Sequence, residues 1–99
     1  MIALTRLRVP SDADGAAPAA LHGVLTALAG KPGFVRGRVG VSVDEPDLLV
    51  LMTEWSGAGA YRRGLSGYDV KIAFADLMSY VVDEPNAFEV LSMEDRPEG

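Results

Sequence analysis

The chain of 99 residues has the length of one domain, so we treat residues 1–99 as a single domain. Its net charge of −5 argues against nucleic acid and anionic membranes as partners, because binding to phosphate needs a basic surface. The sequence contains no cysteine, which excludes disulfides, cysteine–zinc sites and thiol catalysis.

The first ten residues, MIALTRLRVP, lack the long apolar core of a secretory signal. No segment approaches the ~20 consecutive apolar residues that span a bilayer. We therefore expect a cytoplasmic protein that does not contact a membrane.

Residues 2–9 alternate in polarity, which predicts a strand that Pro10 ends. Residues 11–15, SDADG, form a predicted loop with several candidate helix N-caps. Apolar residues at helical spacing then predict a helix over 16–29, with Pro18 in its first turn and Gly30 as its stop signal.

Residues 34–43 alternate again and predict a strand, with Val35, Val39, Val41 and Val43 on one face. The turn 44–47, DEPD, leads into residues 48–55, which are apolar except for Thr53 and Glu54. A short apolar run between turn signals is typical of a central strand covered on both faces. We expect these two strands to form a hairpin.

Ser56 is a candidate N-cap for a helix that carries Tyr61 and Leu65. Ser66-Gly67 interrupts the helical pattern, and a second helix is predicted over 69–79. Its expected apolar stripe consists of Val70, Ala73, Phe74, Leu77 and Met78. A last strand over 87–93 completes a core of about residues 2–92, and a polar tail follows at 93–99.

The order strand, helix, strand, strand, broken helix, strand predicts an α+β fold with two split strand–helix–strand units, the ferredoxin-like arrangement. Helices would then cover one face of a four-stranded antiparallel sheet. The other face is too apolar to be fully solvated, so we expect a second copy of the chain to cover it in a homodimer.

Trp55, the only tryptophan, ends the central strand, and Tyr61 follows six residues later on the next helix. Two aromatic side chains with polar tips at one end of a core can line a pocket for a flat substrate. The tyrosine hydroxyl could hold a phenolate oxygen or pass a proton. The alternative is that both are ordinary core aromatics.

Single polar residues offer further candidates, each with a plainer alternative. His22, the only histidine, is either a base at the helix–sheet boundary or a surface residue. Arg36 could bind an acidic or phenolate substrate, or pair with an acid. Glu54 is either a buried base with a raised pKa or the partner of a neighbouring arginine.

Metal and phosphate sites are not expected. With one histidine and no cysteine, only carboxylate clusters remain, and DEPD and DEP are typical of turns. The glycines at 33, 37 and 40 lie within a strand pattern, where glycine marks a bulge or a close backbone approach rather than a phosphate loop.

Three segments, KPGFVRGRV, LLVLMTEWSGAGAYRRGL and YVVDEPNAFEVL, resemble in this order the antibiotic biosynthesis monooxygenase family. That resemblance covers roughly residues 2–92 and implies a ferredoxin-like domain that pairs as a dimeric α+β barrel. Trp55 and Tyr61 match the family's strand-end tryptophan and following tyrosine. Cofactor-free members carry an asparagine where this chain has Leu51, and haem-degrading members carry a histidine on a helix that has none here.

By this resemblance we expect a cofactor-independent monooxygenase that oxidises a phenolic, polyketide-type aromatic substrate with O₂ and uses no cofactor or metal. Trp55 and Tyr61 are the expected catalytic residues. The alternatives are a polyketide cyclase on the same barrel and a non-catalytic binding or scaffold dimer. The residues expected to bind the substrate are Leu51, Phe74, Arg36 and His22.

Overall fold

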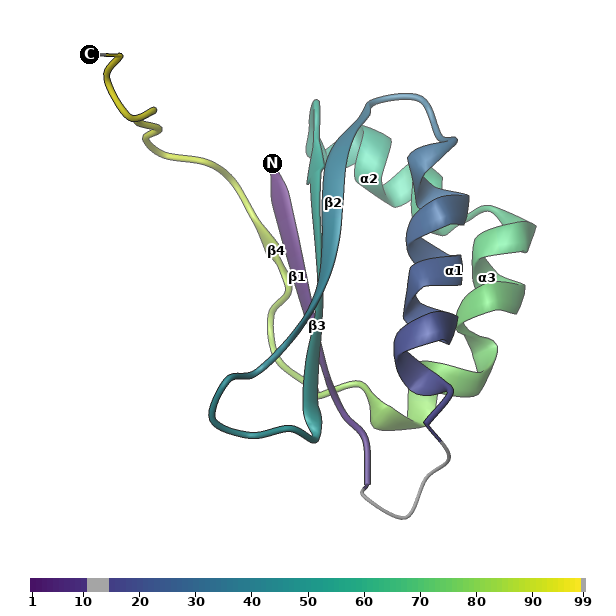
Figure 1. Cartoon of the computed structure of the whole chain (residues 1–99). Coiled ribbons are helices and arrows are strands. Elements are labelled where there is room, and N and C mark those ends of the chain that lie inside the picture. The colour runs from purple at the N-terminus through teal and green to yellow at the C-terminus, as the bar shows by residue number, and fades with distance from the viewer. Residues whose placement is uncertain (11–14, 99) are drawn as a thin grey trace.

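The chain folds into one antiparallel sheet with its helices on a single face, as Figure 1 shows. The computed structural model describes residues 1–10 and 15–98. Within these residues four strands lie in the order β2-β3-β1-β4. This is the predicted ferredoxin-like α+β arrangement. The elements are β1 (Ile2–Arg8), α1 (Ala17–Ala29), β2 (Phe34–Val41), β3 (Leu48–Trp55), α2 (Ala58–Leu65), α3 (Tyr68–Phe74), the 3₁₀ helix η1 (Ala75–Tyr80) and β4 (Ala87–Phe88).

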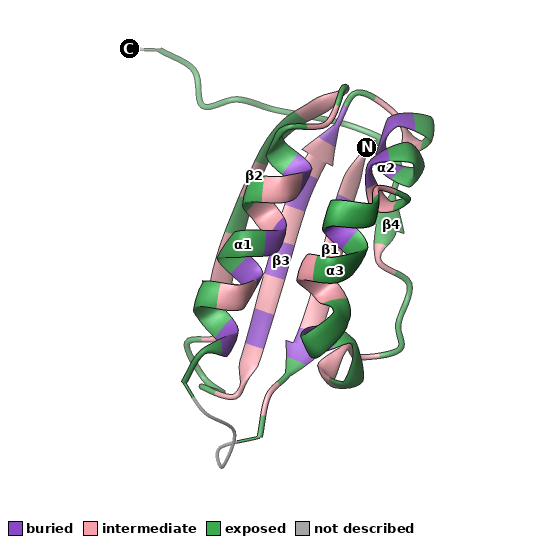
Figure 2. Cartoon of the chain, turned by 90° about the vertical axis from the view of Figure 1, so that its right-hand side faces the viewer, coloured by how far each residue is buried: buried purple, intermediate pink, exposed green. Residues whose placement is uncertain are grey.

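Strand β3 is central, as predicted, and pairs with β1 on one side and with β2 on the other. Its side chains alternate between buried and half-buried, which Figure 2 shows as purple and pink bands. The buried set, which includes Leu49 and Leu51, faces the helices. Leu48, Val50 and Met52 lie on the helix-free face and stay half-buried, so one chain covers only one face of this strand.

Helix α1 packs its apolar stripe on the sheet as the spacing predicts. Pro18 lies in the first turn and Gly30 is the C-cap, both as expected. Leu21, Val24 and Leu28 are buried. Most of the candidate N-caps in SDADG lie at residues 11–14, outside the described residues.

The predicted strand over 34–43 is interrupted by a β-bulge between Phe34 and Arg36. The bulge changes the register, so Val35 points to solvent. Val41, the last residue of β2, and Val43, in the bend that follows the strand, are also exposed. Of the four valines predicted to share one face, only Val39 packs against the core.

The break at Ser66-Gly67 is confirmed, and it separates α2 from α3. Two details differ from prediction. The N-cap of α2 is Gly57 rather than Ser56. The helix predicted over 69–79 tightens after Phe74 into η1, which has three residues per turn instead of 3.6. The expected stripe therefore loses its phase, and Met78 becomes exposed.

The last strand is much shorter than the predicted 87–93. Phe88 already lies opposite Ile2, the first residue of β1, so a longer β4 would run past the end of its neighbour. Val90, Leu91 and Met93 are exposed on a segment that leads away from the body in Figure 1. These apolar side chains have no cover within the described chain.

Gly64 and Gly23 make a matched pair for testing how tightly α2 packs on β3. A Cβ at Gly64 would lie 2.8 Å from Trp55 Cη2, whereas a Cβ at Gly23 would meet nothing within 4 Å. We predict that Gly64→Ala lowers the free energy of unfolding by about 1–3 kcal/mol, because the buried ring cannot move aside. Gly23→Ala should raise it by about 0.4–1 kcal/mol through reduced freedom of the unfolded chain.

Urea unfolding of the two variants and the parent measures both effects. A Gly64→Ala variant as stable as Gly23→Ala would contradict the close packing of α2 against Trp55.

Candidate functional site

A cavity of about 600 Å³ lies between β1, the helices α2 and α3, and the segment that follows η1. Leu65, Val70, Phe74, Met78 and Val81 provide most of its apolar wall. Among the described residues, polar side chains line it at Thr5, Tyr61, Lys71 and Asn86. A largely apolar cavity with a few polar groups suits a small organic molecule.

Three of the polar residues form one hydrogen-bonded cluster. Asn86 Nδ2 donates to Thr5 Oγ1 and to Tyr61 Oη, each at 3.1 Å. The asparagine backbone is fixed as well, because its carbonyl accepts a 2.7 Å hydrogen bond from the amide of Leu4. The polar group of the cavity is therefore held by β1, α2 and the segment before β4.

Burial raises the pKa of Tyr61 above its ordinary value of 10.0, and the hydrogen bond from Asn86 opposes this only in part. Tyr61 is therefore a neutral phenol at physiological pH. It can donate a hydrogen bond to a ligand.

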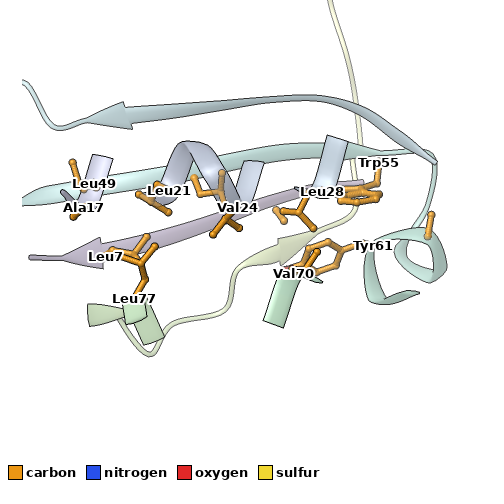
Figure 3. Packing of buried hydrophobic residues seen from close by; sticks show 13 residues of the cluster. Leu7, Ala17, Leu21, Val24, Leu28, Leu49, Trp55, Tyr61, Val70 and Leu77 are labelled. Atoms are coloured by element: carbon orange, nitrogen blue, oxygen red, sulfur yellow. The ribbon is translucent and has the colours of Figure 1, made fainter. Parts of the chain in front are cut away.

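Trp55 lies behind Tyr61 in the core rather than in the cavity wall. Its side chain is 2% exposed, and Nε1 donates to Thr53 Oγ1 at 2.9 Å. The Tyr61 ring lies 5.8 Å away and tilted, and the Phe34 ring meets the indole edge-on at 5.3 Å. Figure 3 shows Trp55 and Tyr61 together at one end of the core. Trp55 can therefore affect the cavity by supporting the Tyr61 ring.

The other predicted substrate-binding residues are dispersed. Phe74 lines the cavity with Tyr61. Leu51 is buried in the core opposite Thr5 and does not line the cavity. Arg36 lies on the helix-free face, where it pairs with Glu54 at 3.4 Å. His22 is exposed on α1. Arg36 and His22 therefore do not reach this cavity, because the first lies on the opposite face of the sheet and the second faces solvent.

Sequence reasoning missed Asn86 and Thr5. Asn86 looked like part of the DEPN turn, and Thr5 like one residue of an alternating strand. The hydrogen bonds of Asn86 span 81 residues to Thr5 and 25 to Tyr61, so no local pattern connects them.

The described residues contain no group of three or more His, Cys, Asp or Glu that could hold a metal ion. Over the same residues, no helix is long and apolar enough to cross a membrane.

Solved structures confirm in three dimensions the resemblance to antibiotic biosynthesis monooxygenases. A candidate antibiotic biosynthesis monooxygenase from Deinococcus radiodurans superposes with a TM-score of 0.81 at 17% identity, covering 98% of both chains. One from Nitrosomonas europaea gives 0.75 at 16%, covering 92% of this chain and 98% of the other. A variant of SnoaB, a cofactor-independent oxygenase from Streptomyces nogalater, gives 0.72 at 21%, covering 93% of each.

No protein-family model and no curated protein matches the sequence. At these identities the superpositions establish the shared fold. The chemistry has to be argued from the cavity itself.

We predict that Tyr61 makes the protein less stable at alkaline pH. Its pKa is raised in the folded state, so above the ordinary value of 10.0 the unfolded chain loses the proton that the folded chain still holds. The contribution of Tyr61 to the unfolding free energy is fully present below that ordinary value, and it is lost as the pH rises through the raised pKa of the folded state. Tyr61→Phe should therefore show a flatter fall in unfolding free energy between neutral pH and about pH 11 than the parent.

The matched control is Tyr68→Phe, which removes the hydroxyl of a tyrosine that is 78% exposed. Urea unfolding across the pH range is the measurement. Equal slopes for Tyr61→Phe and the parent would contradict the burial of the Tyr61 hydroxyl.

Proposed function

We propose that the protein is a cofactor-independent monooxygenase that oxidises a phenolic aromatic substrate of the polyketide type with O₂. The observation that carries this proposal is the apolar cavity of about 600 Å³ with a phenol and an amide side by side in its wall. The fold shared with SnoaB, itself a cofactor-independent oxygenase, supports it.

In this chemistry the substrate supplies the electrons. Loss of a proton converts the phenolic substrate to an anion, which transfers electrons to O₂ and forms a carbon–oxygen bond. One oxygen atom stays in the product as a quinone carbonyl, and the other leaves as water. The protein has to bind, desolvate and orient the anion, which an apolar cavity with a neutral hydrogen-bond donor can do.

Tyr61 is the proposed catalytic residue that contacts the reacting oxygen. Its raised pKa keeps the hydroxyl protonated, so its role is to donate a hydrogen bond to the developing phenolate rather than to remove a proton. Phe74 and its apolar neighbours would pack on the faces of the substrate. Trp55 acts through Tyr61, because its ring limits how the tyrosine ring can lie.

One observation favours the alternative of a non-catalytic binding protein. Cofactor-free relatives are expected to carry an asparagine at the position of Leu51, and here that side chain is apolar and buried in the core. Oxygen consumption distinguishes the two functions. It also separates the oxygenase from a cyclase, which would use the cavity without consuming O₂.

We further propose that the protein is a homodimer that covers the helix-free face of the sheet. Leu4, Val50 and Met52 form a partly exposed apolar surface there, with Met52 directly opposite Leu4. Three of the four arginines on this face are paired within the chain: Arg6 with Glu84 at 3.7 Å, Arg8 with Asp47 at 3.1 Å, and Arg36 with Glu54 at 3.4 Å. Arg38, opposite Met52, makes no ion pair with the described residues. Paired charges lower the cost of burying such a face against a partner.

Oxygen uptake with an anthrone-like phenol, under metal-free and flavin-free conditions, tests the oxygenase. We predict that the parent consumes O₂ and that Tyr61→Phe reduces kcat/KM by about tenfold to a hundredfold, the effect of one lost hydrogen bond to a charged oxygen. Tyr68→Phe should match the parent, because the Tyr68 side chain is exposed and does not line the cavity.

A Tyr61→Phe variant as fast as the parent would contradict the role of the Tyr61 hydroxyl. A parent that consumes no O₂ with any such phenol would contradict the oxygenase itself and support the binding or cyclase function.

Sedimentation at micromolar protein tests the dimer. We predict a dimer for the parent and a 10.5 kDa monomer for Val50→Lys, because the new ammonium group would lie opposite Arg6 and be buried at the interface without an acidic partner. The matched control, Ala19→Glu, puts a charge on the exposed side of α1 and should remain dimeric. A parent that sediments only as a monomer would contradict the proposed interface.

A further inference from the structure

We propose that Asn86 is the positioning residue of the cavity. By donating to the Tyr61 oxygen, it leaves the phenol hydrogen free for a ligand, and so selects ligands that present a hydrogen-bond acceptor, such as an aromatic ketone or phenolate oxygen. This inference rests on the proposed function only in assuming that the cavity binds a small aromatic molecule.

The assignment follows from counting hydrogens at the cluster. Asn86 Nδ2 carries two hydrogens, and it donates to two oxygens, Thr5 Oγ1 and Tyr61 Oη. Both hydrogens are therefore used. The Tyr61 oxygen is an acceptor on that side, so its own hydrogen must point elsewhere.

That hydrogen has no protein acceptor among the described residues, where the bond from Asn86 is the one hydrogen bond made by Tyr61 Oη. Tyr61 is 7% exposed and lines the cavity, so the acceptor left for this hydrogen is whatever molecule occupies the cavity. A buried donor without an acceptor is costly, so a ligand that supplies an acceptor gains affinity there.

The backbone around Asn86 keeps this geometry fixed. Its carbonyl accepts from Leu4 N at 2.7 Å, and the next two residues, Ala87 and Phe88, pair with β1. Thr5, on the same strand, supplies the second acceptor for the amide. The side chain that orients Tyr61 is therefore anchored at both its backbone and its amide.

Two tricyclic ligands of matched shape test the direction of these hydrogen bonds. Fluorenone presents only an acceptor oxygen, whereas carbazole, a tricycle of nearly the same shape, presents only a donor N–H at the corresponding position. The quantity to measure is the ratio of their affinities by calorimetric titration. Tyr61→Phe gives the baseline ratio, which reflects desolvation of the two ligands without the tyrosine hydroxyl.

We expect the parent to favour fluorenone by about threefold to tenfold over this baseline, the effect of one hydrogen bond. Asn86→Asp is nearly isosteric but can only accept, so it should draw the Tyr61 hydrogen to itself and shift the ratio towards carbazole. Asn86→Ala frees the hydroxyl to rotate and should bring the ratio close to the baseline. Tyr68→Phe, the control, removes an exposed hydroxyl that does not line the cavity and should retain the preference for fluorenone.

An Asn86→Asp variant with the parent's ratio would overturn the inference, because it would mean that residue 86 accepts from Tyr61 in the parent as well. Should that variant fail to fold, an unchanged ratio in Asn86→Ala overturns it equally. A parent that binds both tricycles without preference refutes only the role of Asn86. A parent that binds neither refutes the proposed ligand class and the inference together.

Discussion

The packing of Trp55 at the end of β3 is the constraint on which the rest of the site depends. The indole is almost completely buried, and its nitrogen donates a hydrogen bond to Thr53. The ring of Phe34 packs edge-on against one side of the indole. Gly64 lets α2 lie directly on the ring. That contact determines where α2 sits, and hence where Tyr61 enters the wall of the cavity.

Tyr61 in turn connects α2 to β1 and to the segment before β4. The phenol oxygen accepts a hydrogen bond from Asn86, and Asn86 donates a second one to Thr5. One amide therefore connects β1 and the segment before β4 to α2. The cavity is thus formed by elements from both halves of the chain. Its polar group is assembled only when β1, α2 and the segment before β4 have come together.

Much of the fold could be predicted because its signals are local. The alternation of β3, the stripe of α1, the stop at Gly30 and the break at Ser66-Gly67 each depend on neighbouring residues. The errors arise where local patterns are insufficient. A bulge after Phe34 turns Val35 outward, and β4 stops at Phe88, opposite Ile2, where β1 begins.

The site was only partly predictable for the same reason. Trp55 and Tyr61 were singled out by their position at a strand end and on the next helix, and they do lie in contact. Their division into a supporting ring and a cavity-lining phenol depends on packing that no spacing reveals. Asn86 could not be found, because its importance comes entirely from contacts with residues far away in the sequence.

A crystal structure of the protein with a bound anthrone-like phenol or its quinone product tests the central claim most directly. The account predicts that the aromatic skeleton occupies the cavity, with an oxygen within hydrogen-bonding distance of Tyr61 Oη and Phe74 packed on the rings. A ligand bound elsewhere, or bound in the cavity with its oxygen directed away from Tyr61, would contradict it.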